Sequence, residues 1–92
     1  MAEKKFSEEV DKVFKNVIAL FQAMLSDRAV PRNLKRVAQN GISELTNGTD
    51  TPGVLASNVM SMVDDLVTDP NIPFHTRTTI FRVISILETI KD

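Results

Sequence analysis

His75 is the one histidine in this chain of 92 residues, so it is the first candidate for metal binding or acid–base chemistry. A zinc site needs three or four ligands, and the chain offers no cysteine and no second histidine to complete one. The serines and threonines lie in no Gly-x-Ser-x-Gly turn, and there is no glycine-rich phosphate loop. The sequence therefore predicts no catalytic residue, no metal site and no cofactor. We interpret His75 as a partly exposed residue in the first turn of a helix.

Asp64 and Asp65 are neighbours in the sequence, and two carboxylates placed together can serve as general acid and base. Adjacent residues of a helix, however, point about 100° apart, so the two carboxylates cannot converge on one substrate atom. We interpret the pair as part of a solvated helix face, and we predict that the protein is not an enzyme.

Cations and acids are separated along the chain, although the formal net charge is only −1. The segment 28–36 holds four cations and no acid: Arg28, Arg32, Lys35 and Arg36. The segment 50–69 holds four acids and no base. The basic segment could bind the phosphates of RNA or DNA, with the weak, salt-sensitive affinity that four contacts give. It could equally contact a protein partner, or be neutralised by the acidic surface beside it.

Apolar residues recur at steps of three and four in four separate runs, which is the spacing of amphipathic helices. Ser7 is placed to cap the first helix, and Pro31, Pro52 and Pro73 are placed to open the others. The sequence predicts one all-α domain with a disordered lead-in over residues 1–6 and helices at about 7–25, 31–46, 52–67 and 73–90. No apolar run is long enough for a signal peptide or a membrane span, so we expect a cytoplasmic protein.

The chain matches itself without gaps at an offset of 42 residues. At that offset Asn16-Val17 aligns with Asn58-Val59, and the loop residues Asp27 and Pro31 align with their counterparts in the second half. The match indicates a duplicated helical hairpin, and it resembles a HEAT-type repeat. Two repeats are fewer than the roughly three that a solenoid needs. We therefore predict that two HEAT-like hairpins close on each other as an antiparallel up-and-down four-helix bundle.

The resemblance to HEAT repeats also implies a role for the turns. In such a turn an aspartate accepts hydrogen bonds from free amides at the start of the next helix. Asp27 and Asp69 hold this position, each four residues before a proline, Pro31 and Pro73. We expect these four residues to be structural turn caps.

Two proline-centred motifs resemble a narrower group. They read Val-Pro-Arg-Asn-Leu-Lys-Arg at 30–36 and Asp-Pro-Asn-Ile-Pro-Phe-His-Thr-Arg-Thr at 69–78, before a closing Leu-Glu-Thr-Ile at 87–90. In these motifs, and over nearly its whole length, the chain resembles the archaeal uncharacterised protein family 0147. The resemblance implies an all-helical bundle from an archaeon, and it implies no activity and no site residues.

The helix predicted at 73–90 is apolar around more than half of its circumference. The side chains expected to fill the core are Ile80, Ile84 and Leu87. Those left for an interface are Val83, Ile86 and Ile90. Their aligned counterparts in the first hairpin are glycine or glutamate, so the repeat itself does not require apolar groups there. Since surplus apolar surface marks an interface, we predict a homodimer with Ile86 near its centre.

These observations predict a non-catalytic helical interaction module that acts through protein–protein contacts, with a second copy or with another protein. The alternative is a protein that associates weakly with RNA or DNA through the basic segment. Nothing in the sequence indicates a membrane contact or a small-molecule substrate.

Overall fold

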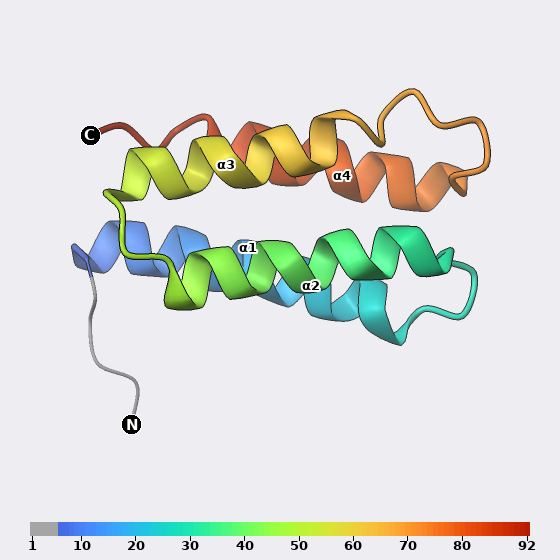
Figure 1. The fold of residues 1–92 in the computed structure, drawn as a ribbon, viewed down its shortest axis with the longest axis horizontal. Coiled ribbons are helices and arrows are strands. Elements are labelled where there is room, and N and C mark those ends of the chain that lie inside the picture. The colour runs from blue at the N-terminus through green and yellow to red at the C-terminus, as the bar shows by residue number, and fades with distance from the viewer. Residues whose placement is uncertain (1–5) are drawn as a thin grey trace.

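The computed structural model describes residues 6–92, and these residues form four helices and no strand (Figure 1). The helices are α1 (Glu8–Ser26), α2 (Arg32–Asn47), α3 (Pro52–Asp64) and α4 (Phe74–Leu87). The prediction of an all-α four-helix fold is confirmed. None of the helices in this part of the chain is long and apolar enough to cross a membrane.

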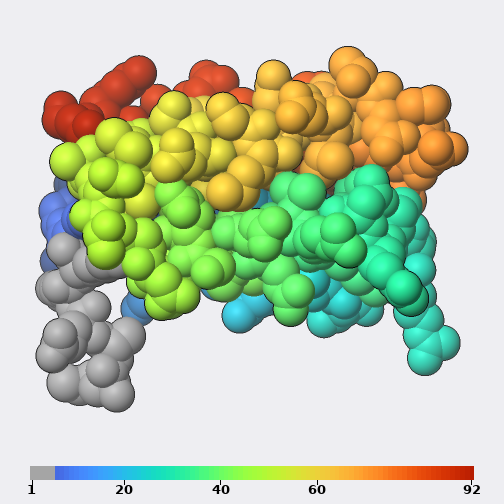
Figure 2. Space-filling model, viewed as in Figure 1, coloured from blue at the N-terminus to red at the C-terminus, as the bar shows by residue number. Residues whose placement is uncertain are grey.

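The helices lie in two layers that enclose one core. Each helix packs against the helices next to it in the order α1, α2, α3, α4, and α4 also packs against α1. Figure 1 shows the chain running from left to right along α1, returning along α2, and repeating this path along α3 and α4. In Figure 2 the side chains of α2 and α3 meet along the face toward the viewer.

Each helix contributes four buried residues at steps of one, three or four. They are Phe14, Val17, Phe21 and Met24 of α1; Leu34, Ala38, Gly41 and Leu45 of α2; Leu55, Ala56, Val59 and Val63 of α3; and Thr76, Ile80, Val83 and Leu87 of α4. Val30 and Ile72 add a buried side chain from the loop before α2 and the loop before α4. The core therefore extends into both loops.

The predicted orientation of the last helix is wrong. Val83 is fully buried and Ile90 is 9% exposed, so both belong to the chain's own core. Ile84, expected in the core, and Ile86 are only partly buried against it. The buried stripe of α4 is therefore centred on Val83, and the proposed interface of Val83, Ile86 and Ile90 does not exist as an exposed strip.

Gly41 explains the error. It aligns with Val83, and in the sequence pattern a glycine at that place indicates a position that need not be apolar. In the structure Gly41 is buried, and a Cβ atom built on it would lie 2.6 Å from Cε2 of Phe21. Position 41 has no side chain because the Phe21 ring occupies the space that a side chain would need. In the second hairpin the aligned residues Val63 and Val83 fill the equivalent space.

The helix ends differ from prediction by one to three residues. α3 ends at Asp64, because the following amides of Leu66 and Val67 bond to the carbonyls three residues back, at 3.0 and 3.2 Å. α4 ends at Leu87 for the same reason, since Ile90 N–H donates to the Leu87 carbonyl at 3.0 Å. Such i→i−3 bonds tighten the last turn and end the α-helix.

The start of the chain gives one confirmation and one correction. Ser7 caps α1, since its Oγ accepts the amide of Val10 at 3.2 Å. Residues 1–5 of the predicted lead-in lie outside the described part. Phe6, the last residue of that lead-in, is half-buried and packs edge-to-face on Phe14 with ring centroids 5.9 Å apart, so it is not disordered.

The fit of Phe21 against Gly41 predicts a strong coupling between the two positions. In the wild-type background Gly41→Ala forces a methyl group onto the buried ring, and we expect a net loss of about 1–2 kcal/mol once overpacking is offset by helix propensity. In a Phe21→Val background the methyl has room, and the same change should stabilise the helix by up to about 1 kcal/mol. Denaturant unfolding of the four proteins measures this cycle. Additive effects would show that the ring does not set the size of residue 41.

Candidate functional site

The side chains that come closest to a chemical site are His75 and Asp27, which lie 48 residues apart in the sequence. Nε2 of His75 and Oδ2 of Asp27 are 2.7 Å apart. Because an ionised carboxylate only accepts hydrogen bonds, Nε2 carries the proton. Asp27 directly follows α1 and His75 is the second residue of α4, so the contact joins the loop end of the first hairpin to that of the second.

A local turn fixes the Asp27 carboxylate. Its Oδ1 accepts the amide of Ala29 at 2.8 Å, and Oδ1 of Asp69 accepts the amide of Asn71 at 2.9 Å in the same way. Both are turns in which an aspartate binds the amide two residues further on. The expected acceptor role is present, but the donors lie in the loops, ahead of the helix starts. Pro31 and Pro73 stand one residue before α2 and α4, as the N-cap residues.

The surroundings of Asp27 favour its charged form. The hydrogen bond from His75 lowers the pKa of the Asp27 carboxyl below its usual 3.8, and the amide of Ala29 and the nearby charge of Lys35 act in the same direction. The side chain of His75 is 61% exposed and that of Asp27 32% exposed. The pair is therefore a partly solvated contact rather than a buried catalytic dyad.

A small cavity of about 160 Å³ opens beside this pair, between α1 and α4. Its lining residues are Leu20, Ala23, Met24, Asp27, Val30, His75, Thr76 and Thr79. Thr76 is only 1% exposed, and its Oγ1 has no hydrogen-bond partner among the described residues. The hydroxyl of Thr79 is already used, since it donates to the carbonyl of His75 at 3.1 Å. The cavity thus has mainly apolar walls, and the Thr76 hydroxyl beside it is buried away from solvent without a partner.

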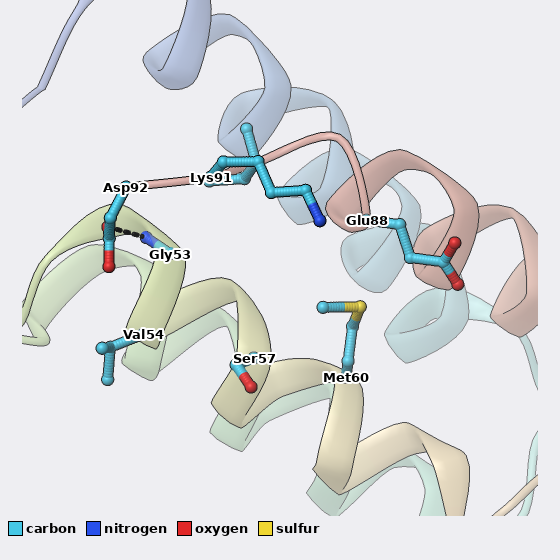
Figure 3. A pocket seen from close by; sticks show the side chains of 8 residues that line it. Gly53, Val54, Ser57, Met60, Glu88, Lys91 and Asp92 are labelled. Atoms are coloured by element: carbon cyan, nitrogen blue, oxygen red, sulfur yellow. Dashed lines mark hydrogen bonds between the residues drawn. The ribbon is translucent and has the colours of Figure 1, made fainter.

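A larger and more open cleft of about 630 Å³ lies between α3 and the residues that follow α4 (Figure 3). Asp92 closes one end: its carboxylate accepts the amide of Gly53 at 2.8 Å and the hydroxyl of Thr51 at 2.7 Å. These contacts cap the start of α3, where Thr51 makes no side-chain cap of its own. Met60, Lys91 and Glu88 face the open part of the cleft in Figure 3. The Asp92 carboxylate is therefore a helix cap rather than a free acid.

Residues 6–92 contain no cluster of three histidine or carboxylate side chains that could hold a metal ion. Asp64 and Asp65, the paired acids, are both exposed near the end of α3.

The predicted basic residues gather where the α1–α2 loop enters α2. Arg28, Arg32 and Arg36 are exposed and Lys35 is half-buried. Within residues 6–92 the side chains of these four residues make no ion pair and no hydrogen bond, so the acids of the second hairpin do not neutralise them by direct contact. Lys12 and Lys15 are two further exposed cations, in the first half of α1 and away from the α1–α2 loop. The stretch from Lys12 to Ser43 contains six cations and a single acid, Asp27.

Two exposed aromatic side chains were also missed. Phe74 is 75% exposed and Phe81 is 50% exposed, whereas Phe14 and Phe21 are buried. The spacing of Phe74 and Phe81 is the signal that could have found them, since residues seven apart lie on one side of a helix and neither fits the Thr76–Ile80–Val83–Leu87 stripe.

Comparisons with known proteins agree in both sequence and fold. The model of the uncharacterised protein family UPF0147 matches residues 1–90. The archaeal "UPF0147 protein" sequences of Metallosphaera sedula and Sulfurisphaera tokodaii are 42% and 40% identical over 78 residues, which is 85% of this chain and 88% of each relative.

Two solved structures share the fold. The crystal structure of the unknown function protein MMP1188 matches with a TM-score of 0.84 at 36% identity, over 98% of this chain and 100% of that chain. A UPF0147 protein from Thermoplasma acidophilum matches with a TM-score of 0.82 at 33% identity, over 90% of this chain and 99% of that chain. The resemblance drawn from the two proline-centred motifs is confirmed.

The lowered pKa of Asp27 predicts an acid-dependent contribution to stability. A carboxyl whose pKa is lower in the folded state stabilises that state fully above its unfolded pKa, and the contribution is lost as the pH falls through the folded value. We expect the difference in unfolding free energy between wild type and Asp27→Asn to be constant above about pH 5 and to shrink below about pH 4.

Asp69→Asn is the matched control, because Asp69 makes the same turn but has no histidine partner. Urea unfolding of all three proteins from pH 3 to 7 provides the measurement. A pH-independent difference for Asp27→Asn would contradict the role of the His75 contact.

Proposed function

Because the chain belongs to the uncharacterised protein family UPF0147, whose description assigns no reaction, we propose from the geometry that the protein is a non-catalytic interaction module that binds a partner protein through α4. The observation that carries the proposal is the exposure of Phe74 and Phe81. Large apolar side chains exposed together mark sites of protein contact.

The spacing of the two rings suits a protein surface. Seven residues correspond to about 10.5 Å along a helix and to nearly the same direction around it, so one partner segment can cover both. Fully burying a phenylalanine side chain contributes about 1.5–3 kcal/mol, before association costs are subtracted. The free energy of burying both rings therefore favours binding of a partner to this face of α4 over the other faces of the molecule.

The absence of a catalytic arrangement in residues 6–92 supports the same proposal. His75 and Asp27 form a partly solvated pair, and the hydroxyl of Thr79 beside them is held by its own helix. A nucleophile that serves with a histidine base has to lie within hydrogen-bond reach of it, and within residues 6–92 the His75 ring is bonded to Asp27 rather than to a hydroxyl.

The predicted homodimer is one form that the interaction could take. With Val83 and Ile90 buried, its interface would have to use the Phe74 and Phe81 side of α4, with Ile86 at most at its edge. Sedimentation equilibrium of the purified protein separates this form from a complex with a different protein.

The first test is binding by Phe74→Ala/Phe81→Ala compared with wild type. A partner captured by the immobilised wild-type protein from nuclease-treated lysate should bind the double variant at least tenfold more weakly, which corresponds to about 1.4 kcal/mol. Stability should change by no more than about 0.5 kcal/mol, because both rings are largely exposed.

Val54→Ala is the matched control, since Val54 is 40% exposed on α3. The purified partner is then titrated against all three proteins by calorimetry. Equal affinity of wild type and the double variant, together with a monomeric wild type, would remove α4 as the binding surface.

A second candidate function is weak binding of RNA or DNA, favoured by the unpaired arginines of the basic segment. Changing Arg32, Lys35 and Arg36 to alanine should abolish binding to mixed RNA at low salt and leave thermal stability nearly intact. If some binding persists, the loss of three phosphate contacts should make the plot of log binding constant against log salt concentration less steep, by about 2–3 in slope.

Arg82→Ala/Lys91→Ala removes charge from the other hairpin and is the control for a general charge effect. Wild-type protein that fails to bind mixed RNA in a filter assay at low salt would eliminate this candidate.

A further inference from the structure

The outer surface of α1 and α2 carries no exposed acid over residues 12–47. Every exposed side chain in this range is a cation, an amide, a hydroxyl or an alanine. The range contains two acids, Asp27 and Glu44, and both are half-buried and bonded to the second hairpin. Asp27 contacts His75, and Oε2 of Glu44 accepts a hydrogen bond from Nδ2 of Asn58, each at 2.7 Å. The cations of this surface therefore have no exposed acid among them.

The outward row of α2 consists of cations and neutral polar groups. Arg32, Arg36, Gln39 and Ser43 each stand two residues before one of the four core residues of α2. Two residues correspond to about 200° around a helix, so this row points away from the core. The acid of α2, Glu44, lies off this row on the side of α3, where it binds Asn58.

The same surface continues onto α1. Lys15 and Gln22 are exposed and lie seven residues apart, on one side of the helix. Leu20 and Met24 line the cavity toward α4, and each is two residues from Gln22, on the opposite side. Since α1 packs against α4 and α2, the side with Lys15 and Gln22 borders α2. Lys15 stands about 16 Å before the end of α1. Cations therefore lie at both ends of the surface, with amides between them.

The lack of large exposed apolar side chains distinguishes this surface from a protein interface. The buried centre of a protein–protein interface is mainly apolar and rich in aromatic residues. On the outer surface of α1 and α2 no exposed apolar side chain over residues 12–47 is larger than alanine. Interfaces with nucleic acids are more polar and much more positively charged. The surface therefore fits a nucleic acid better than a protein.

The positions of the aromatic rings and of the cations favour a double helix over a single strand. Proteins hold single strands by stacking the bases on aromatic side chains. The rings of Phe14 and Phe21 in α1 are buried. Phe74 and Phe81 are exposed, but they belong to α4, which packs against α1 and α3. A double helix instead offers a charge about every 1.7 Å along its axis, so cations spread over about 16 Å can contact several phosphates at once.

We propose that the outer surface of α1 and α2 binds the phosphate backbone of a nucleic-acid double helix, through Arg28, Arg32, Lys35 and Arg36 at one end and Lys15 at the other. The proposal rests on the second candidate function, and it adds the form of the nucleic acid and the contact surface beyond the basic segment. The amides and hydroxyls between the two ends donate hydrogen bonds to phosphate and sugar oxygens. A protein docked on the outer side of α4 leaves this surface open.

Fluorescence anisotropy of the full chain with labelled nucleic acids at low salt is the first measurement. A DNA duplex of about 15 base pairs is about 50 Å long and exceeds the surface. The protein should bind a duplex at least about fivefold more tightly than either of its single strands. An RNA duplex of the same sequence shows which of the two is the better source of the backbone. Poly-glutamate, the acidic-polypeptide comparison, should bind at least about tenfold more weakly than the better duplex.

Two variants test the surface beyond the basic segment. Lys15→Ala should make the plot of log binding constant against log salt concentration less steep by about 0.9, the loss of one phosphate contact. Lys91→Ala, at an exposed position of the second hairpin, is its matched control. Gln39→Glu places a negative charge in the middle of the surface and should weaken duplex binding about fivefold. Asn71→Asp makes the same change of net charge at an exposed position of the other hairpin and should leave binding unchanged.

The outcomes separate this proposal from the two candidate functions. Single strands bound as tightly as the duplex, poly-glutamate bound as tightly as the duplex, or equal effects of Lys15→Ala and Lys91→Ala would each overturn it. Binding of single-stranded RNA that depends on the basic segment but not on Lys15 would leave the second candidate function standing and remove the present proposal. Phe74→Ala/Phe81→Ala should bind the duplex as wild type does, so loss of the protein partner and loss of the duplex are separate results.

Discussion

Four helices of 13 to 19 residues hold this chain together only because each buries its apolar stripe against the others. Isolated helices of such lengths are marginal in water, and a chain without cysteine has no disulfide to support them. The shared core therefore decides the orientation of every helix. The Phe21 ring illustrates how strict this constraint is, since it leaves no room for a Cβ atom on Gly41.

The same constraint determines which groups remain for function. Once α4 turns Val83 inward, Phe74 and Phe81 are left outside, and Thr76 carries a hydroxyl into the apolar interior. The loops that connect the helices bring Asp27 and His75 together at one end of the bundle. The exposed phenylalanines, the buried Thr76 hydroxyl and the contact between Asp27 and His75 are thus all consequences of how the core is filled.

Much of the fold could be predicted from the sequence, because the helices, the Ser7 cap and the proline positions are local signals. The buried residues also agree with the hypothesis of a duplicated hairpin: Phe14, Val17, Phe21 and Met24 lie 42 residues before Ala56, Val59, Val63 and Leu66, all of them buried. The orientation of α4 was not predicted, because Gly41 looks polar in a sequence pattern and is in fact part of the core. The contact between Asp27 and His75 and the cavity beside it depend on packing between hairpins, which no local pattern reports.

The carboxylate of Asp92 on the start of α3 has a consequence for motion. Gly53 N–H and Thr51 O–H both donate to this side chain, about forty positions away along the chain, and a Cβ on Gly53 would collide with it at 2.7 Å. If residues 88–92 separated from α3, the hydroxyl of Thr51 and the amide of Gly53 would both lose their acceptor at once. We therefore expect the tail and the first turn of α3 to open together. The cleft of Figure 3 lies between these same two segments, so its width depends on the two hydrogen bonds that the Asp92 side chain accepts.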